Sequence, residues 1–164
     1  MPNAVLQPAS PPPGARLLAL DYGEARIGVA GSDDLGLLAH PLETVPAQPQ
    51  DQALRRIAAL FHERKASAIV LGLPVRQDGE EGRAALKVRA FGGLLRAHLP
   101  AGTPIHYQDE YRSTVQATEH LRSSGKRTKT HRPLIDQAAA VVILEDFLNA
   151  GVACAAHDPL QSAV

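Results

Sequence analysis

The order of apolar segments along the chain limits the fold more than any other feature. Three short segments with a strand-like pattern occupy the first fifty residues, at 16–20, 26–31 and 36–45. A tight connection over residues 22–25 joins the first two, which is typical of a hairpin, so an antiparallel meander is predicted. The pattern then alternates between helical and strand-like periodicity. The predicted helices are 52–64, 81–98, 113–121 and 133–149, and the predicted strands are 68–71 and 103–107.

A meander followed by alternating helices and strands predicts one mixed sheet in an α/β fold. The later strands should run parallel to the first and be covered by helices, and five strands in the order 3-2-1-4-5 satisfy this. A chain of 164 residues is long enough for one hydrophobic core but not for two. We therefore expect a single domain over residues 15–150, between a proline-rich tail at 1–14 and a C-terminal tail at 151–164, where Gly151 stops the helical pattern.

Composition and charge exclude several classes of protein. The one cysteine, Cys154, cannot form an internal disulfide, and no segment approaches the roughly 18 apolar residues of a membrane-spanning helix. These features favour a cytoplasmic protein that does not contact a membrane. The chain has 17 basic and 17 acidic side chains and a formal net charge of zero. A global positive field is therefore absent, and any contact with nucleic acid must come from local patches.

Three carboxylates are expected at one edge of the predicted sheet. Asp21 ends the first strand, on the face of its buried side chains, and Glu110 follows the carboxyl end of the last strand. Asp136 lies one turn into the final helix, on the stripe that carries Ala140 and Ile143. A turn role for Asp21 and dipole interactions for the other two remain alternatives. The position of Asp136 on a core-facing stripe favours a functional role.

Convergence of three carboxylates would be tolerable only with cations present. Ligation by oxygen alone is typical of Mg²⁺ or Mn²⁺, and two such ions can activate a water and stabilise the departing oxygen of a phosphodiester. The histidines are scattered and Cys154 is isolated, so no better base or nucleophile stands out. The pattern predicts metal-dependent phosphodiester hydrolysis by Asp21, Glu110 and Asp136.

The strongest local positive charge lies between the last two predicted helices, in a segment without acidic residues. Its basic side chains are Arg122, Lys126, Arg127, Lys129 and Arg132. We predict that this segment contacts a phosphate backbone, with an ordinary solvated loop as the alternative. Arg76, in the glycine-containing loop 72–82, is a secondary candidate for such a contact. Arg26 could neutralise either Glu24 or a phosphate.

Four segments of the chain resemble one known family. They are LLALDYGEARIGVAGSD (17–33), IVLGLPVRQDGEEG (69–82), DEYRST (109–114) and IDQAAAVVILEDFL (135–148). In this order they resemble the YqgF/RuvX family, described as Holliday-junction resolvases or pre-16S rRNA nucleases with a ribonuclease-H-like fold. The resemblance implies an acidic triad at Asp21, Glu110 and Asp136. Tyr111 stands where the family pattern DER has arginine, and Arg112 follows one place later as a candidate nucleic-acid contact.

The resemblance implies branched DNA or precursor rRNA as the substrate, and the sequence does not decide between them. A junction enzyme should act as a symmetric homodimer, whereas an RNA-processing enzyme could act as a monomer. Two other classes compete. Asp21, Gly23 and Gly28 are spaced as in the phosphate-binding hairpin of actin-like ATPases, but the chain lacks the length for their second domain. A non-catalytic nucleic-acid-binding module would bind without metal-dependent cleavage.

Overall fold

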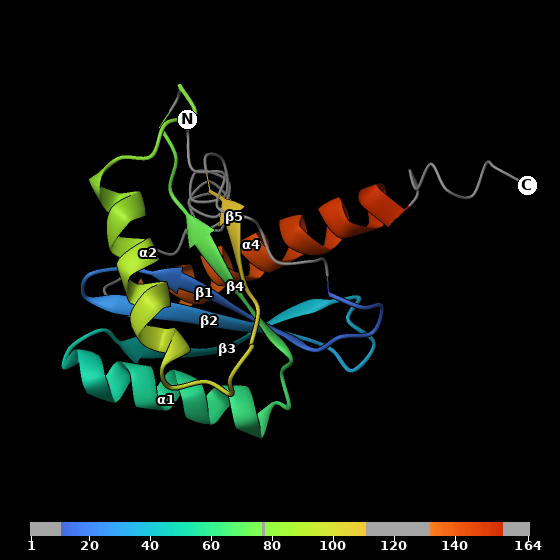
Figure 1. Cartoon of the computed structure of the whole chain (residues 1–164), viewed down its shortest axis with the longest axis horizontal. Helices are drawn as coiled ribbons and strands as arrows, with labels where there is room; N and C mark the ends of the chain where they lie inside the picture. Colours follow the sequence, from blue (N-terminus) through green and yellow to red (C-terminus); the bar gives the residue numbers. More distant parts are fainter. Residues whose placement is uncertain (1–10, 77, 111–131, 156–164) are drawn as a thin grey trace, which may run out of the picture.

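The sheet has the strand order that the sequence predicts. The computed structural model describes residues 11–76, 78–110 and 132–155, and Figure 1 shows their arrangement. The five strands are β1 (Leu17–Tyr22), β2 (Arg26–Ser32), β3 (Ala39–Pro46), β4 (Ala68–Leu73) and β5 (Ile105–Asp109). They lie in the order β3-β2-β1-β4-β5, with β1, β2 and β3 antiparallel and with β4 and β5 parallel to β1. The predicted mixed sheet is therefore confirmed.

Helices cover both faces of this sheet. On one face lie α1 (Gln50–Glu63) and α2 (Arg83–Arg96), and on the other lies α4 (Arg132–Ala155) (Figure 1). Strand β1 supplies both cores because successive side chains of a strand point to opposite faces. Leu18 and Leu20 belong to the core under α1 and α2, whereas Leu17 and Ala19 belong to the core under α4. The predicted helix 113–121 lies outside the described residues.

Several elements end later than the sequence predicts, among them β5 and α4. Strand β5 begins at Ile105 because Thr103 is held in a turn, where its amide and hydroxyl both donate to the carbonyl of Pro100. The strand therefore reaches Asp109 and carries the chain directly to Glu110. Helix α4 continues past Gly151 to Ala155, since one glycine costs a helix only about 1 kcal/mol. Among the described residues, no helix is both long and apolar enough to cross a membrane.

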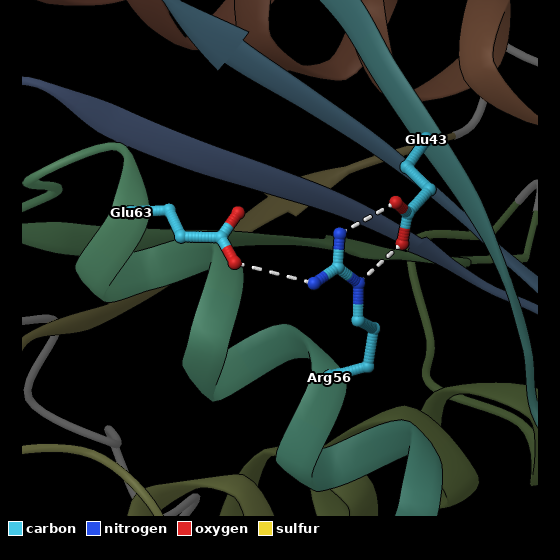
Figure 2. Close-up of polar contacts among 3 residues, drawn as sticks. All are labelled: Glu43, Arg56 and Glu63. Atoms are coloured by element: carbon cyan, nitrogen blue, oxygen red, sulfur yellow. Dashed lines mark hydrogen bonds and ion pairs between the residues drawn. The ribbon is translucent and has the colours of Figure 1, made fainter.

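An ion-pair cluster links α1 to the edge strand β3. The Nε and Nη2 atoms of Arg56 each donate to Glu43 at 2.8 Å, and Nη1 donates to Glu63 at 3.3 Å (Figure 2). The bond from Arg56 lowers the pKa of Glu43 below its usual value. Two parallel bonds to one carboxylate fix the geometry of a guanidinium more firmly than a single contact does. The cluster thus holds α1 in place on the sheet.

We expect Arg56→Ala to lower the free energy of unfolding by about 1 kcal/mol, because this pair is only half-exposed and bidentate. Arg55→Ala is the matched control, since Arg55 pairs with the exposed Asp51 at 3.7 Å on the same helix. That control should change the free energy by no more than about 0.5 kcal/mol. Urea denaturation of both variants measures the difference, and equal values would contradict a stabilising role for the cluster.

Candidate active site

Asp21 lies on the α4 side of the sheet, near the carboxyl end of β1. Leu17 and Ala19, at alternate positions before it, pack in the core under α4, so Asp21 continues that row toward the sheet edge. Across the hairpin, Asp21 is in register with Gly28 of β2. The carboxylate is therefore placed by a buried strand and partly covered by a helix.

Glu110 reaches the same edge from β5. Its backbone amide donates to the carbonyl of Leu73 at 3.0 Å, which continues the parallel pairing of β4 and β5 by one residue. Gly72 of β4 leaves the space that the Glu110 side chain occupies. A Cβ atom at Gly72 would lie 2.5 Å from Oε1 of Glu110 and 2.5 Å from Cδ1 of Ile143. Glu110 thus sits in a gap between β4 and α4 that only glycine can leave open.

The carboxyl groups of Asp21 and Glu110 form a hydrogen bond with each other. Burial, the charge of Asp21 and their shared hydrogen bond together raise the pKa of Glu110 to about 9, with burial the largest cause. Burial also raises the pKa of Asp21, as does the charge of Asp136, while the bond from Glu110 opposes this shift. Two buried carboxyl groups in contact need either a shared proton or a cation.

Asp136 approaches this pair from the first turns of α4. The helix backbone lies directly against Gly28, where a Cβ atom would overlap the carbonyl oxygen of Asp136. Since Gly28 is the partner of Asp21 across the hairpin, this contact brings the acidic turn of α4 beside Asp21. The Asp136 carboxylate itself binds Arg26, whose Nε donates to Oδ2 at 2.8 Å.

Arg26 therefore has a partner that the sequence did not suggest. Of the two roles considered for Arg26, neutralising Glu24 is wrong, because Glu24 forms an ion pair with Lys87 of α2. The hydrogen bond from Lys87 lowers the pKa of Glu24. Tyr22, beside the acidic strand end, packs against Phe91 with ring centroids 4.7 Å apart.

The site offers carboxylate oxygens of the kind that bind divalent cations, but the three carboxylates do not surround a common point in this structure. Within the described ranges, no three acidic, histidine or cysteine side chains stand in an arrangement that could hold a metal ion as they are. The contact between Asp21 and Glu110, and the gap at Gly72, nevertheless provide adjacent oxygen donors whose repulsion a cation would relieve. All-oxygen donors suit Mg²⁺ or Mn²⁺. Asp136 could supply a third donor once its carboxylate leaves Arg26.

The structure describes only two of the seven residues predicted to contact nucleic acid. Arg76 is exposed in the loop after β4, where its backbone closes a turn with Gly79 and Glu80. Arg132 is the first residue of α4. The remaining candidates lie outside the described residues: Arg112, Arg122, Lys126, Arg127 and Lys129. A role in binding nucleic acid stays a prediction for all seven.

Sequence reasoning missed three residues that shape this site, Arg26 as the partner of Asp136 and the two glycines at positions 28 and 72. One signal was available for Gly28. A two-strand hairpin with a short turn places Gly28 opposite Asp21, and a glycine opposite a functional carboxylate on one face suggests a close approach by another backbone.

Similar proteins align with most of this chain and over most of their own length. The model of the RuvX family, described as Holliday junction resolvase, matches residues 15–150. A protein of Streptomyces avermitilis named "Putative pre-16S rRNA nuclease" is 48% identical over 134 residues, which cover 82% of this chain and 85% of that protein. A protein of the same name from Rhodococcus erythropolis is 44% identical over 149 residues, covering 87% and 83%.

Solved structures give weaker similarities. RuvC of Thermus thermophilus in complex with a Holliday junction substrate matches with a TM-score of 0.47 and 20% identity, covering 87% of this chain and 96% of that one. The fowlpox virus resolvase in complex with Holliday junction DNA matches with a TM-score of 0.44 and 9% identity, covering 87% and 99%. The family match and the relatives above 40% identity show that this chain belongs to the RuvX family of nucleases, with the ribonuclease-H-like fold that the resemblance implied.

Proposed function

We propose that this protein is a metal-dependent nuclease that hydrolyses phosphodiester bonds of structured nucleic acid in the cytoplasm. The observation that carries the proposal is the buried contact between Asp21 and Glu110 at the carboxyl ends of parallel strands. Ligands of open α/β sheets commonly bind at this edge. Membership of a nuclease family supports the same chemistry.

In this proposal, Asp21, Glu110 and Asp136 hold two Mg²⁺ or Mn²⁺ ions. Bound ions of this kind activate a water and stabilise the oxygen that departs from the phosphorus. The protein's own contribution is positional. Strand β1 and the end of β5 fix two of the carboxylates, while α4 brings the third along a helix anchored on Gly28.

The proton between Asp21 and Glu110 has to leave before both groups can bind cations. Because burial raises both pKa values and the charge of Asp21 raises that of Glu110 as well, the metal-free pair retains this proton at neutral pH. Cation binding should therefore release a proton, and the affinity for Mg²⁺ should increase with pH. The basic side chains at positions 76, 112, 122, 126, 127, 129 and 132 would contact the nucleic-acid backbone.

The substrate is either precursor 16S rRNA, cleaved at its 5′ end, or a Holliday junction. The names of the relatives support the rRNA substrate, and the family description supports the branched DNA. A homodimer would be needed to cut two opposed strands of a junction, whereas rRNA processing places no such requirement on the protein.

Cleavage of two labelled substrates tests the proposal. A four-way DNA junction and a precursor 16S rRNA 5′ fragment are incubated with Mg²⁺, Mn²⁺ or EDTA. The native protein is compared with Asp136→Asn and with the control Asp51→Asn, which changes an exposed aspartate of α1. We expect metal-dependent cleavage by the native protein and the control only. If all three proteins bind a substrate and none cuts it, the non-catalytic binding module is the better account.

A further inference from the structure

The ion pair between Arg26 and Asp136 lies at the boundary of the candidate active site. The two side chains are 37% and 23% exposed, and they join β2 to the first turns of α4, which are 110 residues apart in the sequence. Asp136 is also close enough to Asp21 for its charge to raise the pKa of Asp21. One carboxylate thus has an arginine on one side and the acidic pair on the other.

Backbone packing, rather than side-chain flexibility, puts Asp136 in this position. Arg26 and Gly28 lie two residues apart on β2 and therefore on the same face. Because the α4 backbone rests on Gly28, the short Asp136 side chain can reach only its immediate surroundings. Glu24, the nearest acidic residue in the sequence, is already bound to Lys87. The ion pair found for Arg26 in the described part of the chain is the one with Asp136.

The charges explain why this arrangement suits a protein without bound cations. When ionised, Asp21, Glu110 and Asp136 carry three negative charges, and Arg26 supplies one positive charge next to them. A divalent ion bound by all three carboxylates would compete with the guanidinium for Asp136, since both are attracted by the same charge. It would also be repelled by Arg26 for as long as Arg26 stays in place.

We propose that Arg26 is a positioning residue that serves as the counter-ion of Asp136 in the metal-free protein and exchanges with a divalent cation when the site is loaded. Arg26 neutralises the Asp136 carboxylate beside Asp21 and Glu110, and this limits repulsion before the cation arrives. The exchange then turns Asp136 toward the other two acids. This inference rests on the proposed function, because it takes Asp136 as the third metal ligand.

Side-chain NMR of the full chain tests the exchange directly. The Nε–H signal of Arg26, assigned by its absence from Arg26→Lys, is followed as Mg²⁺ is added to ¹⁵N-labelled native protein. We expect this signal to shift with the same midpoint as the backbone amides of Asp21 and Glu110. The Nε–H signal of Arg56, which is bonded to Glu43 and belongs to α1 on the other face of the sheet from α4, should not move.

The titration separates this inference from the proposed function. If the amides at the acidic site respond to Mg²⁺ and the Arg26 signal does not, the exchange is wrong while the metal site stands. If no signal at the acidic site responds to Mg²⁺, the proposed metal site is wrong, and the proposed exchange is wrong as well.

Metal affinity provides a second, independent readout. Removing a positive charge beside the site should tighten binding of Mn²⁺ by about tenfold in Arg26→Gln, measured by calorimetry without nucleic acid. Arg26→Lys retains the charge and should stay nearer the native affinity. Arg16→Gln is the matched control, because Arg16 forms a similar ion pair with Asp34 and is 35% exposed. Unchanged or weaker binding by a folded Arg26→Gln would assign Arg26 a purely structural role and overturn the proposal.

Discussion

Replacing Glu110 by glutamine should make the metal-free protein more stable at pH 8 while it strongly reduces cleavage. In the native protein, burial against Asp21 raises the pKa of Glu110 to about 9, from a usual value of 4.5. At pH 8 the unfolded chain gains the free energy of ionising this group, but the folded protein does not. Glutamine has nearly the same shape and cannot ionise, so the variant does not lose stability in this way.

The sign of the pH dependence follows from the direction of the shift. A group whose pKa is raised by folding contributes stability that is fully present below its unfolded pKa and is lost as the pH rises through its folded pKa. For Glu110 this window runs from about pH 4.5 to about pH 9. The loss can reach about 1.4 kcal/mol per pH unit for one proton. The raised pKa of Asp21 adds to the same trend.

Urea denaturation at pH 5, 7 and 9 in EDTA measures this slope. We expect the free energy of unfolding to decrease with pH in the native protein and to decrease much less in Glu110→Gln. Glu145→Gln, which changes an exposed glutamate of α4, should behave like the native protein. Parallel curves for all three proteins would show that Glu110 ionises normally. Saturating Mg²⁺ should flatten the native curve, because the cation replaces the proton.

The loss of cleavage in Glu110→Gln should be roughly 10³-fold, corresponding to the several kcal/mol that metal ligation contributes to such reactions. Stability and activity are therefore expected to change in opposite directions at one residue. This opposition is informative because a purely structural carboxyl group would not produce it. A variant that is stabilised but fully active would remove Glu110 from the metal site.

The arrangement of the sheet could be predicted because it depends on local periodicity and on general rules of connection. Strand-like and helical patterns alternate clearly, and a parallel strand must be reached by a crossover that covers the sheet. The positions of Asp21 and Glu110 follow from the same reasoning, since the carboxyl ends of parallel strands share one edge. The end of α4 was misjudged, because a single glycine costs a helix only about 1 kcal/mol and Gly151 does not stop it.

The detailed contacts of the site could not be predicted because they depend on how α4 packs against β2. The sequence shows that Asp136 lies on the core-facing stripe, but not which residue of the sheet it faces. That partner, Arg26, is 110 residues away in the chain. The role of Gly72 likewise depends on the crossing of α4, since Ile143 and Glu110 approach it from different elements.

Gly28→Ala is expected to be among the most destabilising single substitutions in this protein. The added Cβ would overlap the carbonyl oxygen of Asp136, which belongs to a helix backbone and cannot rotate away as a side chain could. Helix α4 would have to move off the sheet, and its core contacts at Ala140, Ile143 and Leu144 would loosen. We expect a loss of about 3 kcal/mol in the free energy of unfolding.

Gly93→Ala is the matched control for this substitution. Gly93 lies in the exposed part of α2, and a Cβ there would meet nothing within 4 Å. Since alanine favours a helix over glycine, this variant should gain up to about 1 kcal/mol. The same type of change therefore has opposite effects at two sites, and thermal or urea unfolding distinguishes them. Equal effects would contradict the close packing of α4 on β2.

The effect of Gly28→Ala on cleavage should exceed its effect on stability alone. A helix displaced from Gly28 carries Asp136 away from Asp21, and a misplacement of about 1 Å can cost a catalysed reaction about 10²-fold. The measurement is cleavage at a temperature where the variant is fully folded, with Mn²⁺ at saturation. Native activity in the folded variant would mean that the site does not require α4 at this distance. A large loss of cleavage in the folded variant would show that Gly28 sets the separation between the carboxylate of α4 and the carboxylates at the ends of β1 and β5.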